Sequence, residues 1–444
     1  MDRINYNRMK KIFLFTLVGL ASFQLRAQNI DKIITRDYAD HLIKTLSSDE
    51  MQGRGTFTPG IDKAATFIES EFKKIGLQPL TGEKSFRQTF YKYQISNLSK
   101  TVKIDGKDIA QENLLITGLS AESVSLTKAN TAVVKLDASK PFMGQLRAMM
   151  KVKKNQLILV DAKLADNFKQ YQSYFSKPTT VDEKDYKVGE SNVQVFVLGT
   201  DTVANDFKIE LKNKVDKMPL FNVAGMIPGK SKAKELVVFS GHYDHLGITK
   251  TVNGDSIANG ADDDASGTTA MIALAKYYKA LKNNERTLIF VAFTAEEIGG
   301  FGAKYFSAKL NPDEVVAMFN IEMIGKDSKF GKNTAFITGF DKSDFGKILQ
   351  KNLAGTEFTF HPDPYPDQNL FYRSDNATLA ALGVPAHTIS TDKIDVDEFY
   401  HTVKDEYGTL DVENILSTIK AIAKSAITIV NGTDTPTRIP KLKQ

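Results

Sequence analysis

The chain has 444 residues, of which 42% are hydrophobic and 25% are charged. This composition and length predict one large domain with a smaller one, or two domains, and exclude an intrinsically disordered protein. The 58 basic and 53 acidic residues are dispersed along the sequence, so no basic stretch of the kind that binds nucleic acid is present. The absence of cysteine excludes disulfides, thiol catalysis and thiolate metal ligands.

The first residues have the pattern of an export signal. Two lysines precede an apolar run over residues 12–21, and Ala27 ends a plausible cleavage site before Gln28. The apolar run is about 10 residues long, well below the roughly 20 that span a bilayer. We therefore expect residues 1–27 to be a signal peptide. The mature protein would then be periplasmic or extracellular and would have no membrane span.

The next elements predict a helix followed by a change of architecture. Apolar side chains recur at helical spacing over residues 58–75, and Gly76 supplies a stop signal. Residues 28–94 are therefore assigned to the N-terminal part of the main domain. Residues 95–216 contain short β-rich runs separated by turns rich in lysine and aspartate, with one helical pattern, "PFMGQLRAMMKV". We interpret residues 95–216 as an inserted β-rich domain.

Beyond the insert, apolar strands alternate with amphipathic helices. The strand-like runs are "LVVFSG", "TLIFVAFT", "VVAMFNIEM", "TAFIT" and "AHTIS", and helices are predicted near residues 266–282 and 412–430. This alternation predicts an α/β fold with a mostly parallel sheet and helices on both faces. The main domain covers residues 217–433, and residues 434–444 form a polar tail.

Polar side chains follow several of these strands. In a parallel sheet the ligand site lies outside the carboxyl ends of the strands. His242 follows the first run, and three consecutive aspartates in "NGADDDASG" open the next helix. Glu296 and Glu297 follow the second run, and Glu322 lies near the end of the third. His401 lies in "DEFYHT", close to the last helix.

Each of these groups, taken alone, also has an ordinary structural interpretation. The aspartates could cap a helix, and the paired glutamates could begin a solvated one. Glu322 is harder to explain, because a carboxylate in an apolar strand is costly to bury unless it is paired or bound to metal. Together, the histidines and carboxylates form a nitrogen and oxygen donor set that suits zinc, with enough ligands for two ions.

These motifs resemble those of a known family. The stretches "SGHYDHLG", "NGADDDASG", "FTAEEIGGFGAKYF", "NIEMIG" and "DEFYHTVKD" occur in this order and are similar to those of metallopeptidase family 28. This family of co-catalytic zinc exopeptidases includes bacterial secreted aminopeptidases and glutamate carboxypeptidases. The resemblance covers residues 219–431, and residues 46–79 match the family's opening helices. Residues 95–216 stand where such enzymes often carry a protease-associated domain, although no sharp motif identifies one.

The resemblance implies two zinc ions per chain and a role for each candidate residue. Glu296 would be the general base, which takes a proton from the attacking water and returns it to the leaving amine. Asp244 would orient the imidazole of His242. The implied metal ligands are His242 and Glu322 for one zinc, Glu297 and His401 for the other, and Asp263 as the bridge between them.

Three positions are interpreted separately. The ligand set closes without His245, which we interpret as a loop residue or as a support for a ligand. Glu322 stands where many family members have aspartate, and the family uses either residue. Asn376, in "YRSDNATLAALGVPA", stands where members usually have histidine, so the substrate contacts of that loop stay open.

The implied activity is that of an exported aminopeptidase that hydrolyses N-terminal residues from peptides. Carboxypeptidase cleavage and glutaminyl cyclisation on the same scaffold stay open as alternatives. A cyclase uses one zinc and does not need all five ligands, and a carboxypeptidase would need basic residues in its pocket. A non-catalytic binding domain is the third alternative, but domains of that kind lose metal ligands that this chain retains. The oligomeric state stays open.

Overall fold

The computed structural model describes residues 30–118, 123–175, 178–183, 186, 192–199 and 204–442. The chain forms two compact units: unit 1 comprises Met1–Thr89 and Leu220–Gln444, and unit 2 is Phe90–Pro219. The boundaries between them fall within two long strands, β2 (Arg87–Ile104) and β10 (Phe207–Ile227). The predicted export signal lies outside the described residues. Among the helices that are described, none is long and apolar enough to span a membrane.

Unit 1 begins with helices α2 (Ile30–Ile33) and α3 (Arg36–Leu46), the 3₁₀ segment η1 (Asp49–Arg54) and helix α4 (Pro59–Ile75). Helix α4 has proline at its first position, where the missing N–H costs no hydrogen bond. It ends at Gly76, whose φ of 80° is left-handed and whose N–H bonds the carbonyls of Phe72 and Lys73. The helix predicted over residues 58–75 is therefore present as Pro59–Ile75, and it ends at the predicted stop signal, Gly76.

The sheet of unit 1 has the strand order β17-β16-β18-β15-β11-β14-β10. Four central strands, β18, β15, β11 and β14, are parallel to one another, whereas β10 pairs antiparallel with β14 and β16 antiparallel with β18. The short strand β1 (Gln78–Pro79) also pairs with β10. The strands are β11 (Lys232–His242), β14 (Arg286–Phe293), β15 (Val315–Ile321), β16 (Thr334–Ile337), β17 (Thr359–Pro362) and β18 (Ala386–Ser390). The fold is α/β, as predicted, and its sheet is mixed with a parallel centre.

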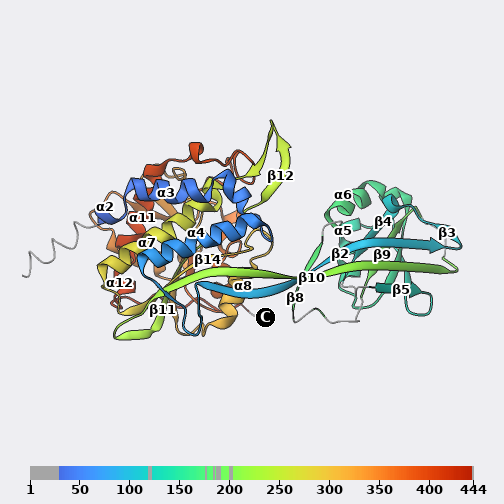
Figure 1. Ribbon diagram of the computed structural model, residues 1–444, viewed down its shortest axis with the longest axis horizontal. Coiled ribbons are helices and arrows are strands. Elements are labelled where there is room, and N and C mark those ends of the chain that lie inside the picture. Colours follow the sequence, from blue (N-terminus) through green and yellow to red (C-terminus); the bar gives the residue numbers. More distant parts are fainter. Residues whose placement is uncertain are drawn as a thin grey trace, which may run out of the picture. The chain divides into compact units, whose positions relative to one another are not determined.

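Helices cover both faces of this sheet. One face packs against α3, α4, α7 (Gly267–Leu281), α9 (Phe345–Asn352) and α11 (Val412–Ser425), and Figure 1 shows α3, α4, α7 and α11 together on one side of the strands. The other face packs against α8 (Phe301–Lys309) and α10 (Asn376–Ala381). Within β11, Val237 and Phe239 belong to the first core and Val238 to the second, as the alternation of a strand requires.

Stacked aromatic rings join the central strands. Phe239 is fully buried, and its ring stacks on Phe290 of β14 and on Phe319 of β15. Truncating a buried phenylalanine to alanine typically costs about 3–5 kcal/mol. The rings therefore hold in register the strands whose ends carry the candidate site.

The candidate site lies at the carboxyl ends of the parallel strands. After β11 the chain forms a hairpin of β12 (Gly247–Val252) and β13 (Asp255–Ala258), and then the π-helical segment η4 (Ala261–Ser266) that leads into α7. The segments after β14 and β15 begin at the same edge of the sheet, because β11 is parallel to both strands. Short helix α12 (Ile427–Val430) follows α11 near the end of the chain.

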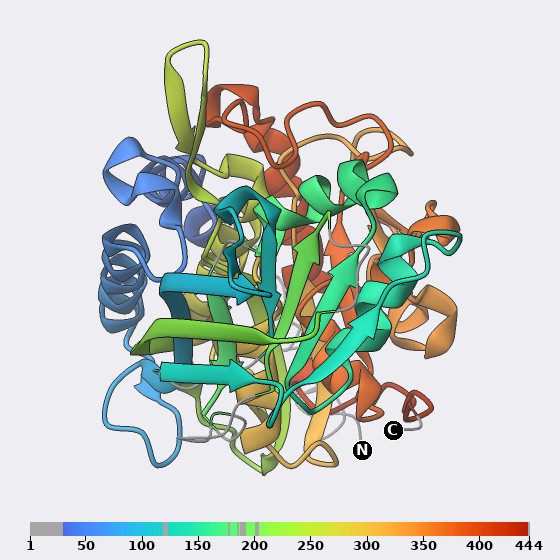
Figure 2. The same cartoon turned by 90° about the vertical axis from the view of Figure 1, so that its right-hand side faces the viewer.

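Unit 2 contains a small sheet with the order β4-β9-β7-β6. Helices α5 (Phe142–Met150) and α6 (Ala165–Phe175) pack on one face of it, as Figure 2 shows. Helix α6 was not predicted, because its sequence, "ADNFKQYQSYF", is mostly polar. The strands of the unit are β3 (Lys107–Asp108), β4 (Leu114–Thr117), β5 (Ser123–Thr127), β6 (Ala132–Lys135), β7 (Gln156–Val160), β8 (Thr179–Asp182) and β9 (Gln194–Leu198).

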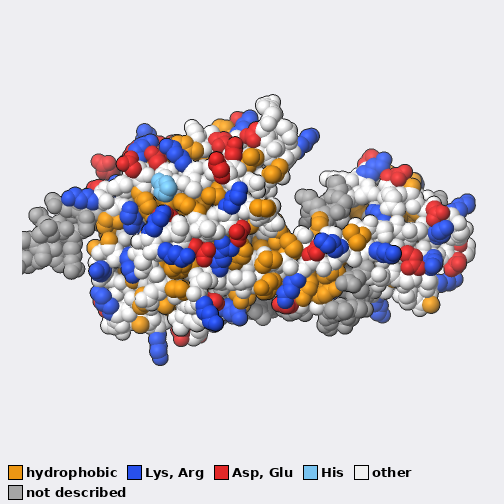
Figure 3. Space-filling view, viewed as in Figure 1, with side chains coloured by type: hydrophobic (Ala, Val, Ile, Leu, Met, Phe, Trp, Pro, Cys, Tyr) orange, Lys and Arg blue, Asp and Glu red, His pale blue; other side chains and the backbone are white. Residues whose placement is uncertain are grey.

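Charged side chains are mixed on the visible surface. On the face shown in Figure 3, lysine and arginine are interspersed with aspartate and glutamate. On this face the basic side chains do not gather into a continuous area of the kind that attracts a phosphate backbone.

Candidate metal centre and active site

A first group of possible metal ligands comes from three separate segments. His242 ends β11, Asp263 lies in η4, and Glu322 directly follows β15. One donor atom from each of the three lies within 4.8 Å of the others. Nε2 of His242 is 3.1 Å from Oδ1 of Asp263, and Nδ1 is 3.1 Å from the carbonyl oxygen of Asp244. A proton on Nδ1 would satisfy that contact and leave Nε2 free to bind a metal.

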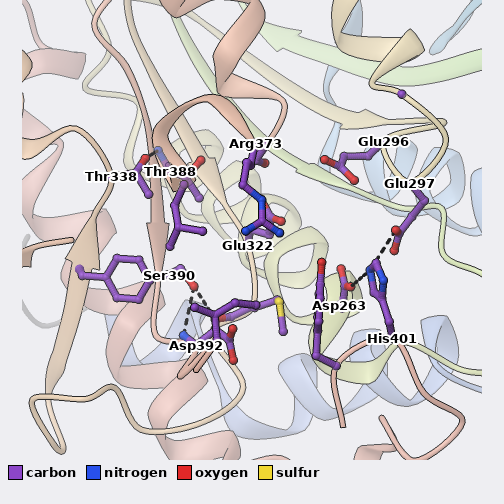
Figure 4. A pocket seen from close by; sticks show the side chains of 17 residues that line it. Asp263, Glu296, Glu297, Glu322, Thr338, Arg373, Thr388, Ser390, Asp392 and His401 are labelled. Atoms are coloured by element: carbon purple, nitrogen blue, oxygen red, sulfur yellow. Dashed lines mark hydrogen bonds and ion pairs between the residues drawn. The ribbon is translucent and has the colours of Figure 1, made fainter. Parts of the chain in front are cut away.

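A second group lies beside the first and shares Asp263. Nε2 of His401 is 3.3 Å from Oδ2 of Asp263 and 3.1 Å from Oε2 of Glu297, and both contacts are drawn in Figure 4. Asp263 therefore directs Oδ1 to His242 and Oδ2 to the second group. A carboxylate with one oxygen toward each group has the arrangement that a bridging ligand needs.

His245 also belongs to the second group. Its Nδ1 is 2.7 Å from Oε1 of Glu297 and 3.7 Å from Oδ2 of Asp263, and these three residues also bring donor atoms within 4.8 Å of one another. This residue is the second histidine of "HYDH". From the sequence alone we interpret it as a loop residue or a support for a ligand, because the implied set of five ligands is complete without it. The structure places this residue in direct contact with Glu297.

The residues present fit a metal pair in their chemistry. Nε2 of His245 is buried and has no hydrogen-bond partner among the described residues, whereas Nε2 of His242 has Oδ1 of Asp263 as its ion-pair partner at 3.1 Å. A metal ion would satisfy an unpaired buried nitrogen such as that of His245. Carboxylates and imidazoles together form the donor set that zinc prefers. The unpaired buried nitrogen and the zinc-type donor set both come from residues in different parts of unit 1.

Electrostatics lead to the same conclusion. Burial alone would raise the pKa of Asp263, but contacts with the histidines outweigh it and hold this pKa well below its usual range. Burial likewise acts to lower the pKa of His401, but contacts with Asp263 and Glu297 raise it to about 10. Without metal, Asp263 and Glu297 therefore favour a proton on the imidazole of His401. A divalent cation can replace that proton, so metal binding would release it.

The three consecutive aspartates have different contacts. The carboxylate of Asp264 accepts hydrogen bonds from the N–H groups of His242 at 3.1 Å, Gly267 at 3.0 Å and Met323 at 3.1 Å. Asp262 accepts from the N–H of Gly325 at 2.7 Å. The two outer aspartates therefore tie neighbouring loops together, and only the central one faces both donor groups.

Asp244 connects the histidine motif with the glutamate pair. Its Oδ1 accepts a hydrogen bond from the N–H of Glu296 at 3.1 Å, and its Oδ2 accepts from the N–H of Glu297 at 3.3 Å and from the hydroxyl of Thr56 at 3.2 Å. Burial raises the pKa of Asp244 to about 6. This carboxyl group therefore fixes the backbone of the two glutamates. Its distance to Nδ1 of His242 is 3.8 Å, and the imidazole instead contacts the backbone carbonyl of Asp244 at 3.1 Å.

A cavity of about 360 Å³ opens beside the two donor groups. Figure 4 shows Glu296, Glu297, Asp263 and His401 on one side of it and Thr338, Thr388 and Ser390 on the other. The side chain of Glu296 points into the cavity, and burial raises the pKa of this group well above its usual range. Arg373 also lines the cavity, whereas Asn376 is fully buried and donates to the carbonyls of Phe371 and Ala386.

The α/β fold and the paired donor groups together form a domain that could bind two metal ions at the ends of its parallel strands. Residues 222–426 match the family model described as peptidase family M28. The matched segment lies within unit 1 and contains all five candidate ligands, His242, Asp263, Glu297, Glu322 and His401.

Individual relatives are similar over shorter segments. A probable zinc metalloprotease of Leptosphaeria maculans is 33% identical over 109 residues, which is 24% of this chain and 25% of that protein. Aminopeptidase YwaD of Bacillus subtilis is 29% identical over 108 residues, 23% of this chain and 22% of that protein. The chain thus spans about a quarter of the length of these curated relatives. Among solved structures, an aminopeptidase from Aneurinibacillus sp. strain AM-1 is similar in fold, with a TM-score of 0.52 and 20% identity, over 94% of this chain and 97% of that one.

Proposed function

We propose that this protein is a zinc-dependent exopeptidase that binds two zinc ions and removes N-terminal residues from peptides. The observation that carries the proposal is the position of Asp263, whose two oxygens face two separate donor groups. The family match and the relatives named as aminopeptidases support the same reaction class. The proposed ligands are His242 and Glu322 on one side of Asp263, and Glu297 and His401 on the other.

The residues of the cavity have distinct tasks in this reaction. Two zinc ions, when bound, supply a water of lowered pKa and polarise the carbonyl of the peptide bond. Glu296 projects into the cavity and has room to take the proton of that water and return it to the leaving amine. Asp244 holds the backbone of Glu296 and Glu297 in place, so that one side chain faces the substrate and the other faces the donor group.

The charge of the cavity favours a cationic group of the substrate. Glu296, Glu322 and Asp263 all line it, and a cleft rich in carboxylates attracts the N-terminal ammonium of a peptide. The wall formed by Phe336 and Leu370 provides apolar surface for a side chain.

A specific observation supports a second candidate, a carboxypeptidase. Arg373 lines the same cavity, and a guanidinium group is well suited to bind a C-terminal carboxylate through two parallel hydrogen bonds. This is the kind of basic residue that a carboxypeptidase pocket requires. Glutaminyl cyclisation has less support, because an enzyme with a single zinc would not need Glu297 and His401 as ligands.

A peptide series decides between the two candidates. Four versions of one short peptide, with free or acetylated N-terminus and free or amidated C-terminus, are assayed with added zinc. An aminopeptidase loses at least about 100-fold in kcat/KM on acetylation, which is about 2.7 kcal/mol, and is indifferent to amidation. Equal rates on acetylated and free peptides, with loss of activity on amides, would establish the carboxypeptidase. In that case Arg373→Met should abolish the preference for a free C-terminus.

We also propose that residues 1–27 are removed on export, on the basis of their basic and apolar pattern. Expression in a Gram-negative host followed by fractionation and N-terminal sequencing should find a periplasmic protein that begins at Gln28. Full-length protein confined to the cytoplasm would contradict this proposal.

A further inference from the structure

Arg54 is a fully buried arginine from the N-terminal part of the chain. It lies outside the segment 222–426 that matches the peptidase family. Its guanidinium group donates only to backbone carbonyls in the contacts that the structure records. The acceptors are Tyr243 at 2.8 Å, Leu46 at 2.6 Å, Asn259 at 2.5 Å, Gly260 at 2.8 Å and Asp263 at 3.4 Å.

Four of these carbonyls belong to the two loops that carry the proposed metal ligands, and the fifth, that of Leu46, lies at the end of α3. Tyr243 directly follows His242, and the carbonyls of Asn259, Gly260 and Asp263 belong to the loop that leads into the bridging carboxylate. One planar group with five donors therefore holds the backbone of both loops at a fixed separation.

The N–H groups of the second loop are held by Asp405. Its carboxylate accepts from the N–H of Asp262 at 2.9 Å and 3.1 Å and from the N–H of Asp263 at 3.0 Å. Asp405 lies four residues after His401 in the sequence. The loop that bears the bridge is thus fixed through its carbonyls by Arg54 and through its N–H groups by Asp405.

The backbone on both sides of Arg54 packs closely against the ligand loops. We call residues 49–56 the N-terminal strap. A Cβ on Gly53 would lie 2.5 Å from the carbonyl oxygen of Ala258, and one on Gly55 would lie 2.9 Å from Cα of Gly247. The N–H of His245 also bonds the carbonyl of Arg54, at 3.2 Å. The N-terminal strap therefore packs backbone against backbone on both ligand loops.

Burying this charge is expensive unless the surroundings compensate for it. An arginine taken out of water without a carboxylate in contact costs several kcal/mol before compensation. Burial lowers the pKa of Arg54, and the carboxylates of Asp405 and Asp263 act in the opposite direction. A buried cation that touches only backbone atoms suggests a role in holding those atoms.

We propose that Arg54 is a positioning residue for the metal bridge. By holding the carbonyls of both ligand loops, it keeps Asp263 turned so that one carboxylate oxygen faces each donor group. The N-terminal strap is then part of the metal centre, although it supplies no ligand. This inference rests on the proposed function, because it assumes that Asp263 bridges two zinc ions.

The test compares two buried arginines in the full-length protein. Arg286 is also fully buried and donates to the carbonyls of Ile429 and Asp434 and to Glu235, at the start of β14. Arg54→Lys keeps the charge but loses the planar fork, and Arg286→Lys makes the same change away from the ligand loops. Zinc affinity is measured by competition with a chromogenic chelator, and the melting temperature is measured with and without zinc.

We expect Arg54→Lys to weaken zinc binding by about 10–100-fold, as loss of a support outside the ligand shell typically does. Arg286→Lys should lower the melting temperature but leave zinc affinity within about twofold of the wild type, because its contacts lie outside the ligand loops. Unchanged zinc affinity in Arg54→Lys, or an equal loss in Arg286→Lys, would overturn the proposal. A wild-type protein that binds no zinc would instead refute the proposed function.

If Arg54→Lys is unfolded without metal, its urea midpoint is measured over a series of zinc concentrations. A midpoint that rises to the wild-type value at high zinc supports a role through the metal centre. A midpoint that zinc does not restore shows that Arg54 serves folding alone, and the proposal fails.

Discussion

Glu296→Gln and Glu297→Gln should have different consequences, although the residues are adjacent. Glu297 is almost completely buried, with Oε1 2.7 Å from His245 and Oε2 3.1 Å from His401. Glu296 points into the cavity, and its backbone N–H is held by Asp244. Replacing the carboxylate of Glu296 with an amide of the same shape leaves that backbone contact intact, whereas the same change at Glu297 removes a charge that faces two imidazoles.

The expected magnitudes follow from these roles. Loss of a general base typically lowers turnover by about 10²–10⁴-fold, or about 2.7–5.4 kcal/mol of barrier. Glu296→Gln should therefore lose activity while keeping close to two zinc ions. Glu297→Gln should lose zinc as well, because an amide is a weaker donor than a carboxylate and leaves the imidazoles without their counter-charge.

Turnover on an unblocked peptide and metal content by mass spectrometry are measured on the same preparations. Glu314→Gln serves as a control, because Glu314 is exposed at the surface of unit 1. Wild-type turnover in Glu296→Gln would refute its assignment as the base. Two tightly held ions in Glu297→Gln would refute its assignment as a ligand.

Three further outcomes are expected. Exhaustive chelation should abolish hydrolysis and zinc should restore it, with close to two ions per chain; activity that survives chelation contradicts the mechanism. His245→Asn should weaken zinc binding by about 10–100-fold, because it removes the contact with Glu297; an unchanged affinity in the chelator competition would exclude this support. Burial lowers the pKa of His387 to about 4. The buried neutral imidazole therefore contributes its full stabilisation above the unfolded pKa of about 6.5, and the free energy of unfolding falls by roughly 3 kcal/mol as pH drops toward 4. In urea unfolding, the free energy of unfolding of His387→Gln should lack this pH dependence, and that of the exposed-site variant His41→Gln should keep it. The same pH dependence in both variants would disprove the prediction.

Local patterns in the sequence were sufficient for several elements of the fold. Helix α4 was predicted because its apolar spacing and its terminal Gly76 are both local signals. The strand β11 was predicted for the same reason, since a continuous apolar run of this length is typical of a strand buried on both faces. Helix α6 was missed, because a polar sequence becomes helical there through packing against the sheet of unit 2.

For the candidate site, too, the sequence predicted one part and left another open. His242, Asp263, Glu297, Glu322 and His401 were selected from the sequence, and the structure brings all of them to one edge of the sheet. Their roles as ligands stay predictions until metal is measured.

The sequence by itself determined the fold class, the resemblance to a family and the chemical kind of the donor atoms, because periodicity and motif spacing are properties of neighbouring residues. Only the tertiary structure decided that His245 contacts Glu297, that Arg373 lines the cavity and that Arg54 holds both ligand loops. Arg54 is separated from its acceptor in Gly260 by more than 200 residues. A contact of that range depends on how the strands and helices pack, and no local pattern encodes it.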